Sequence, residues 1–342
     1  MEYRFYVGSY AQPQEEAISR YRVDFEKKMF VKELACCNLD WPSFLLMHPN
    51  GKILYAGREL TTEGAIHAFE VRGDQLLRRG TWETGGSDPC NMCLDDEARF
   101  LFVANYSGSN VSVFALDKEG IPTAMVENKK HTGSGPLLSR QRAPHPHCVY
   151  YRDGLLFVCD LGTDTVYRYV VDKESGRLTA SWSISVPGGA GPRHLTFHPR
   201  HPELLYVIGE MSSEIYLFRL EEERAVLLQT VSTLPGDFTR YNIASGIKFA
   251  PDGKTLFASN RGHESIAVYQ VEDSGRLQIR QHCPSGGVTP RDFTLFGDYL
   301  LVGNQDSNNI SVFHYDAAAY ALTRCPMTLK VTAPSLIMKW EG

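Results

Sequence analysis

Four residues of this 342-residue chain, His147, Arg193, Glu210 and Arg261, combine side chains that are suited to binding and reacting with an anion. A guanidinium can donate two parallel hydrogen bonds to a carboxylate or phosphate, and it can stabilise negative charge that develops on a carbonyl oxygen. Histidine and glutamate commonly act as general acids and bases. Each of the four also differs in kind from the residues at equivalent positions of an internal repeat. We therefore predict that they are functional and that the ligand is a small anion.

The repeat is a short segment in which large apolar residues are followed by a small residue and then a polar one. Its seven copies end at residues 10, 59, 106, 161, 210, 261 and 305, so that successive copies lie 44 to 55 residues apart. A period in this range, built from strands, is typical of propeller blades. Residues 243–281 illustrate the full unit, with four short strands separated by turns such as Ala250-Pro-Asp-Gly253.

The sequence thus predicts an all-β fold, a seven-bladed β-propeller with four-stranded antiparallel blades, as a single domain over residues 1–342. Residues 333–340 resemble the first strand of each unit, such as 41–47, whereas the N-terminus begins with a second strand at residues 5–10. We therefore expect the N- and C-terminal strands to complete one blade and close the ring, which leaves no sheet edge exposed.

In each unit, the first and second strands form a hairpin, so the start of the first strand and the end of the second should meet opposite the hairpin turn. We expect the side chains at these ends to lie around one central mouth and predict that some of them bind substrate: His145, His194, Arg291 and Gln305. Other residues at these ends are Tyr10, Glu59, Tyr106 and Asp292. Arg140 and Gln141 are further predicted substrate-binding residues, because the long connection 129–147 can rim or cover this mouth. Asn105, Asp160, Asn260 and Asn304 share one repeat position and are predicted to be structural.

Composition excludes several classes of partner. The chain is 43% hydrophobic and 22% charged with a net charge of −5, and its basic residues form no run beyond Lys129-Lys130, so neither nucleic acid nor membrane is an expected partner. The N-terminus lacks the features of a secretory signal, which favours the cytoplasm.

The eight cysteines, including Cys90-x-x-Cys93, are expected to be buried thiols, because no second metal-ligand pair follows. We expect a monomer or a weak homo-oligomer.

Several segments together resemble one known family. They are 7–10, 103–106, Arg140-Gln-Arg-Ala-Pro-His-Pro-His147, 160–164, Ala190-Gly-Pro-Arg-His194, 251–253, 259–262 and 289–293. This set resembles the seven-bladed lactonase family, which includes propeller-type 6-phosphogluconolactonases and carboxy-muconate lactonizing enzymes. The resemblance implies action on a sugar-acid lactone or a related carboxylate, and it places the proposed catalytic cluster of the lactonizing branch on His147, Arg193, Glu210 and Arg261.

The predicted activity is therefore lactone hydrolysis, with 6-phosphogluconolactone, a small anionic sugar lactone, as the substrate. Arg193 and Arg261, with Arg291, are expected to bind phosphate or polarise the lactone carbonyl, while His147 and Glu210 share the roles of general base and acid toward water and the ring oxygen. No cofactor or metal is expected, because arginines and histidines outnumber the acidic residues near the predicted mouth. Two alternatives remain, a muconate-type cycloisomerase and a non-catalytic propeller that acts as a binding scaffold.

Overall fold

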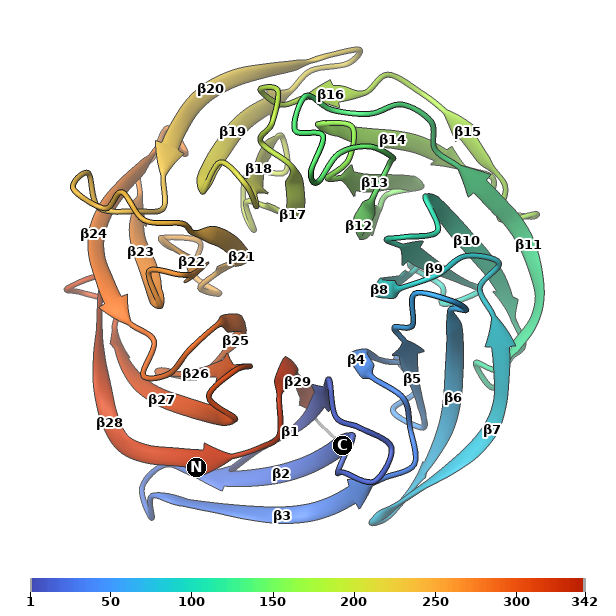
Figure 1. Ribbon diagram of the computed structural model, residues 1–342, viewed down its shortest axis with the longest axis horizontal. Helices are drawn as coiled ribbons and strands as arrows, with labels where there is room; N and C mark the ends of the chain where they lie inside the picture. The colour runs from blue at the N-terminus through green and yellow to red at the C-terminus, as the bar shows by residue number, and fades with distance from the viewer. Residues whose placement is uncertain (1, 341–342) are drawn as a thin grey trace. The chain divides into compact units, whose positions relative to one another are not determined.

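The computed structural model describes residues 2–340, and over these residues it contains twenty-nine β-strands and no helix (Figure 1). The strands form seven antiparallel sheets, six with four strands and one with an additional short strand. This confirms the predicted fold class, a seven-bladed β-propeller with four-stranded blades. The described part of the chain accordingly has no helix that is long and apolar enough to cross a membrane.

The chain divides into two compact units, residues 1–185 with 338–342 and residues 186–337. The sheets of the first unit have the orders β29-β1-β2-β3, β4-β5-β6-β7, β8-β9-β10-β11 and β12-β13-β14-β15, with β16 also paired to β14. Their strands are β1 (Glu2–Ser9), β2 (Ile18–Asp24), β3 (Met29–Cys36), β4 (Pro42–Met47), β5 (Ile53–Arg58), β6 (Ala65–Arg72), β7 (Gln75–Glu83), β8 (Pro89–Leu94), β9 (Phe100–Asn105), β10 (Asn110–Leu116), β11 (Pro122–Lys130), β12 (Pro146–Arg152), β13 (Leu155–Asp160), β14 (Thr165–Val171), β15 (Leu178–Ala180), β16 (Ile184–Ser185) and β29 (Pro334–Trp340), of which residues 338–340 belong to this unit.

The second unit contains three sheets, β17-β18-β19-β20, β21-β22-β23-β24 and β25-β26-β27-β28. Their strands are β17 (Pro192–Phe197), β18 (Leu204–Gly209), β19 (Glu214–Leu220), β20 (Ala225–Ser232), β21 (Ile243–Phe249), β22 (Thr255–Arg261), β23 (Ser265–Val271), β24 (Leu277–Pro284), β25 (Pro290–Phe296), β26 (Tyr299–Asn304), β27 (Asn309–Asp316) and β28 (Ala321–Lys330).

The N- and C-terminal strands share a sheet, as predicted, with β29 next to β1. The side chains support this pairing. The rings of Tyr6 and Trp340 meet edge to face at 5.6 Å, and the Arg20 guanidinium lies 4.4 Å from the Trp340 ring centre. Aromatic pairs and cation–π contacts of this kind add to the stabilisation from apolar burial.

The core of each unit lies between neighbouring sheets. The second strands are the most apolar, and every residue of β9 and of β18 is buried, because these strands are covered on both faces. The fourth strands, such as β20, alternate between partly buried and exposed residues. Tyr206, Tyr269 and Leu256 illustrate the packing between two sheets of the second unit. Burial of large side chains stabilises the fold by about 1.5–3 kcal/mol each and holds the strand ends in place.

One irregularity recurs in the first strand of most sheets, directly after its opening proline. The pairing register skips one residue at Ser43, Cys90, His147, Arg193 and Arg291, and it skips two residues at Ser245 and Gly246. Such a β-bulge leaves the extra residue outside the ladder and re-aims its side chain. Three of the predicted site residues, His147, Arg193 and Arg291, therefore occupy bulge positions.

Candidate active site

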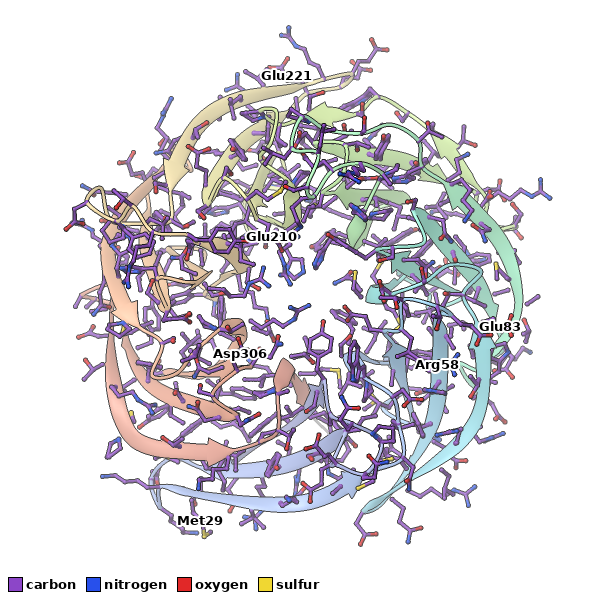
Figure 2. The ribbon with its side chains drawn as sticks, viewed as in Figure 1. Met29, Arg58, Glu83, Glu210, Glu221 and Asp306 are labelled. Atoms are coloured by element: carbon purple, nitrogen blue, oxygen red, sulfur yellow. The ribbon has the colours of Figure 1, made fainter. Side chains whose placement is uncertain are left out.

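A buried carboxylate in the second unit is held between two arginines. Arg193 lies at the bulge of β17, Glu210 directly follows β18, and Arg261 ends β22. Glu210 Oε2 accepts one hydrogen bond from Arg193 Nε at 3.0 Å and another from an Arg261 Nη at 2.7 Å. Figure 2 shows Glu210 near β17 and β21. The structure thus brings three of the four predicted catalytic residues together.

Both guanidinium groups are also tied to the backbone of β21. Arg193 donates to the Ser245 carbonyl at 3.0 Å, and Arg261 donates to the Ala244 carbonyl at 3.0 Å. Arg193 and Glu210 are only 2% and 3% exposed, and Arg261 is 9% exposed. Two guanidinium groups therefore contact one carboxylate at low exposure, and these three side chains together hold one more basic than acidic group. Guanidinium groups held in this way are suited to stabilising an oxyanion, and that role stays a prediction.

The second unit also contains the predicted substrate-binding residues His194, Arg291 and Gln305. His194 Nε2 lies 3.3 Å from Arg193 Nη1, so the His194 ring borders the arginine–glutamate cluster. The Arg291 carbonyl accepts a hydrogen bond from Ser245 Oγ at 2.7 Å, which connects its bulge to β21. The Gln305 Oε1 atom is buried and has no hydrogen-bond partner among the described residues, and a ligand hydroxyl would satisfy it.

In the first unit, three predicted residues converge on the ring of Tyr106. The His145 ring stacks on it at 4.3 Å with an interplanar angle of 15°, and the His147 ring meets it edge to face at 5.6 Å. Arg140 donates to the Tyr106 hydroxyl at 3.3 Å. His147 is 6% exposed at the bulge of β12, whereas the other three side chains are half-buried. Their substrate contacts, like the common mouth, stay predictions.

Gln141, predicted to bind substrate, instead has the contacts of a structural residue. It is fully buried, its Nε2 atom donates to the Leu161 carbonyl and to Asp164 Oδ1 at 2.8 Å each, and its Oε1 atom accepts the Leu137 N–H at 3.1 Å. Because both ends of the amide are bound within the protein, the structure corrects the predicted role. Gln141 fixes the shape of its loop.

The four residues that share a repeat position bind groups within the protein, as expected of residues that hold the structure together. All are fully buried. The Asn105 amide donates to Ser112 Oγ, and the Asn260 and Asn304 amides donate to the carbonyls of residues 233 and 285. Asp160 accepts backbone N–H groups from His145 and Gly162. They stabilise the connections that follow the second strands.

A second polar cluster, in the first unit, was incompletely predicted. Glu59 follows β5, as Glu210 follows β18, and its carboxylate accepts hydrogen bonds from the Tyr10 hydroxyl at 2.8 and 2.9 Å and from the Ser43 hydroxyl. Glu59 and Tyr10 were expected at the mouth, whereas Ser43 was not predicted. The signal that would have found Ser43 is its place after the opening proline, which it shares with His147 and Arg193.

The donor set of these clusters is not typical of a metal centre. Within residues 2–340, no group of three or more His, Cys, Asp or Glu side chains is placed to hold a metal ion. The eight cysteines are thiols, and burial raises the pKa of both Cys93 and Cys159 well above the usual range. Such thiols are poor nucleophiles and poor metal ligands at neutral pH.

Known proteins share this architecture over the full length of the chain. Residues 4–339 match the family model described as "Lactonase, 7-bladed beta-propeller". A 6-phosphogluconolactonase from Bacillus subtilis (strain 168) is 32% identical over 342 residues, which covers 97% of each chain.

Solved structures agree with this match. The structure of a putative 6-phosphogluconolactonase from Bacteroides fragilis has a TM-score of 0.90 at 28% identity, covering 99% of this chain and 98% of that chain. The structure of a periplasmic gluconolactonase from Pseudomonas aeruginosa has a TM-score of 0.93 at 26% identity, covering 99% of each chain. The chain therefore belongs to the 7-bladed beta-propeller lactonase family, which confirms the resemblance found in its sequence and the prediction that it is a lactonase.

Proposed function

We propose that this protein hydrolyses 6-phosphogluconolactone to 6-phosphogluconate. The observation that carries the proposal is the buried cluster of Arg193, Glu210 and Arg261, whose net positive charge and fixed geometry suit an ester carbonyl that becomes an oxyanion. The name of the Bacillus subtilis relative supports the choice of the phosphorylated lactone.

In the proposed reaction, water adds to the lactone carbonyl and the bond between the carbonyl carbon and the ring oxygen breaks. Arg193 and Arg261 stabilise the negative charge on the carbonyl oxygen. His147 takes one proton from the attacking water and returns it to the ring oxygen, which becomes a hydroxyl, while the carbonyl carbon becomes a carboxylic acid that releases its proton to solvent and remains as a carboxylate. Glu210 Oε2 already accepts hydrogen bonds from both guanidinium groups, so of the two candidate bases we assign His147 to the activation of water.

The test is hydrolysis of fresh 6-phosphogluconolactone and of unphosphorylated gluconolactone, followed by NMR against the spontaneous rate. We expect the wild-type protein to accelerate opening of the phosphorylated lactone, with or without a chelator, and we expect Glu210→Gln and His147→Ala to reduce this acceleration by about 100-fold or more. Glu221→Gln is the matched control, because Glu221 also binds an arginine but lies on an exposed turn. Absence of acceleration with both lactones would overturn the proposal and favour a cycloisomerase or a binding scaffold.

Unphosphorylated gluconolactone is the second candidate substrate, because a solved gluconolactonase has a closely similar fold. The same assay separates the two: a higher kcat/KM for the unphosphorylated lactone would select the second candidate. The cytoplasm is part of the first proposal, because a phosphorylated sugar is charged and crosses a bilayer poorly.

A further inference from the structure

A single carboxylate in the first unit closes the loop from His131 to His145, here named the Asp160 loop. Asp160 Oδ2 lies 2.6 Å from His131 Nδ1 at the start of the loop, and Asp160 Oδ1 accepts the backbone N–H of His145 at 2.8 Å at its end. The side chains of His131 and Asp160 are fully buried. A segment of this length whose two ends are joined is an Ω-loop, a class of loop that is frequently functional.

The middle of the Asp160 loop is also fixed. Gln141 binds the neighbouring turn through the Leu161 carbonyl and Asp164, as described above. At Gly162 the two backbones approach so closely that a Cβ atom would lie 1.9 Å from the Ala143 carbonyl oxygen. The loop therefore has a defined shape that is held by buried contacts.

A tyrosine completes the closure behind the loop. The Tyr169 hydroxyl lies 3.0 Å from His131 Nε2, and burial raises the pKa of this tyrosine, so that the hydroxyl keeps its proton and can donate to the ring. His131 Nδ1–H then donates to Asp160. This chain of buried hydrogen bonds orients the Asp160 carboxylate toward the backbone of His145.

The loop presents two basic side chains beside Tyr106. The Arg140 guanidinium donates to the Tyr106 hydroxyl, and the His145 ring stacks on the Tyr106 ring. His145 Nδ1 lies 3.0 Å from the Tyr106 carbonyl, which can only accept, so Nδ1 carries a hydrogen. His145 Nε2 is then the ring nitrogen left for a ligand.

We propose that Arg140 and His145, supported by Tyr106, form the subsite that recognises the phosphate of the substrate, and that Asp160 is the positioning residue of this subsite. A planar guanidinium matches the oxygens of a phosphate monoester, which accept charge-assisted hydrogen bonds, and the neighbouring imidazole can exchange a hydrogen bond with the same group. Both oxygens of Asp160 accept hydrogen bonds from the protein, so this carboxylate is held at the two ends of the loop. This inference rests on the proposed function, because it assumes a phosphorylated ligand.

The first test compares the binding of 6-phosphogluconate and of gluconate by isothermal titration calorimetry. Arg140→Gln is expected to weaken 6-phosphogluconate binding by roughly 10- to 100-fold, because one charge-assisted contact is lost. It is expected to leave gluconate binding unchanged. Arg142→Gln is the matched control, since Arg142 lies on the same loop, is exposed and donates to the Leu138 carbonyl at 2.9 Å. It should change neither affinity.

The outcomes separate the subsite from the proposed reaction. If Arg140→Gln weakens both ligands equally, or keeps the wild-type preference for the phosphorylated ligand, the subsite is refuted even where lactone hydrolysis is observed. If the wild-type protein accelerates neither lactone but prefers 6-phosphogluconate in an Arg140-dependent way, the subsite stands and the proposed reaction fails. A wild-type protein that binds both ligands equally refutes the subsite.

The positioning role of Asp160 is tested with Asp160→Asn. The amide keeps the size of the side chain but cannot accept on both atoms, so the end of the loop at His145 should shift. We expect the ratio of the 6-phosphogluconate affinity to the gluconate affinity to fall about tenfold, whereas a merely structural role would lower both affinities together. An unchanged ratio in a folded variant contradicts the positioning role. If this variant fails to fold, His131→Gln, which loosens the same carboxylate, is measured in the same way.

Discussion

Glu210→Gln removes the negative charge that two buried guanidinium groups share, with almost no change in side-chain size. In the wild-type protein, Arg193 and Arg261 donate to the same carboxylate oxygen at 3.0 and 2.7 Å. In the variant, the amide can accept only weaker hydrogen bonds, and its NH₂ group can be turned toward one guanidinium. The two buried positive charges then repel each other without compensation. We therefore expect the variant to lose both stability and activity.

The magnitude follows from burial and from the number of bonds. A hydrogen bond to a charged group contributes about 1.5–3 kcal/mol, against about 0.5–1.5 kcal/mol for a neutral one, so two bonds lose roughly 2 kcal/mol. Removing one partner of a buried ion pair costs about 3–5 kcal/mol, because charge is left uncompensated at low exposure. Since all three side chains are less than 10% exposed, little of this is screened by water. The expected decrease in the free energy of unfolding is about 3 kcal/mol.

Urea denaturation followed by tryptophan fluorescence measures this change, and the lactone assay measures activity on the same samples. Glu221→Gln is again the control: Glu221 binds Arg224 at 2.6 Å, but Figure 2 shows it at the turn between β19 and β20, away from Glu210. We expect no measurable change in the control, because exposed ion pairs contribute little. A Glu210→Gln variant that loses less than about 1 kcal/mol, with full activity, would refute the reasoning about the cluster.

Three further predictions concern other parts of the fold. Burial, followed by two nearby arginines, lowers the pKa of His67 to about 4, below the value of about 6.5 in an unfolded chain. The unfolded state therefore binds more protons than the folded state between pH 6.5 and 4. The free energy of unfolding consequently falls by up to about 3 kcal/mol as the pH falls through this window. His67→Gln should reduce this pH dependence, which urea titrations at several pH values measure. Gly162→Ala should displace the Ala143 carbonyl and expose the Asp160 loop to trypsin, whereas an unchanged cleavage rate would argue against the tight packing there. Arg193→Lys keeps the charge but loses the planar contact that joins Glu210 to the Ser245 carbonyl, so kcat/KM for the lactone should fall about 100-fold; a loss below threefold would contradict the oxyanion role.

Most of the fold could be predicted because its information is local and repeated. Each blade needs its own alternation of apolar residues and its own turns. Seven copies of one segment therefore predict seven sheets. The pairing of β29 with β1 was also accessible, because residues 333–340 carry the pattern of a first strand. Arg193, Glu210 and Arg261 could be selected for the same reason, since each interrupts the repeat with a charged side chain.

The side-chain contacts were less accessible. Gln141 lies in the loop that sequence analysis singled out, but the direction of its amide depends on a carbonyl and a carboxylate some 20 residues further along the chain. Ser43 differs little from any strand serine until the bulge of β4 turns it to Glu59. The joining of both ends of the Asp160 loop by one carboxylate was likewise not predicted, because Asp160 shares its repeat position with three asparagines.

The number of blades, the shared terminal sheet and the residue types that can act on an anionic lactone follow from strand periodicity and charge, which are properties of the chain. Which of those residues become partners depends on how the strands pack. Bulges after the opening prolines change the direction of single side chains. Whether a buried carboxylate binds a cation, an amide or a backbone N–H group depends on which of them lies within about 3 Å, and the spacing of residues in the sequence does not specify this. As a result, Glu210 binds two arginines, and Asp160 joins the two ends of a loop.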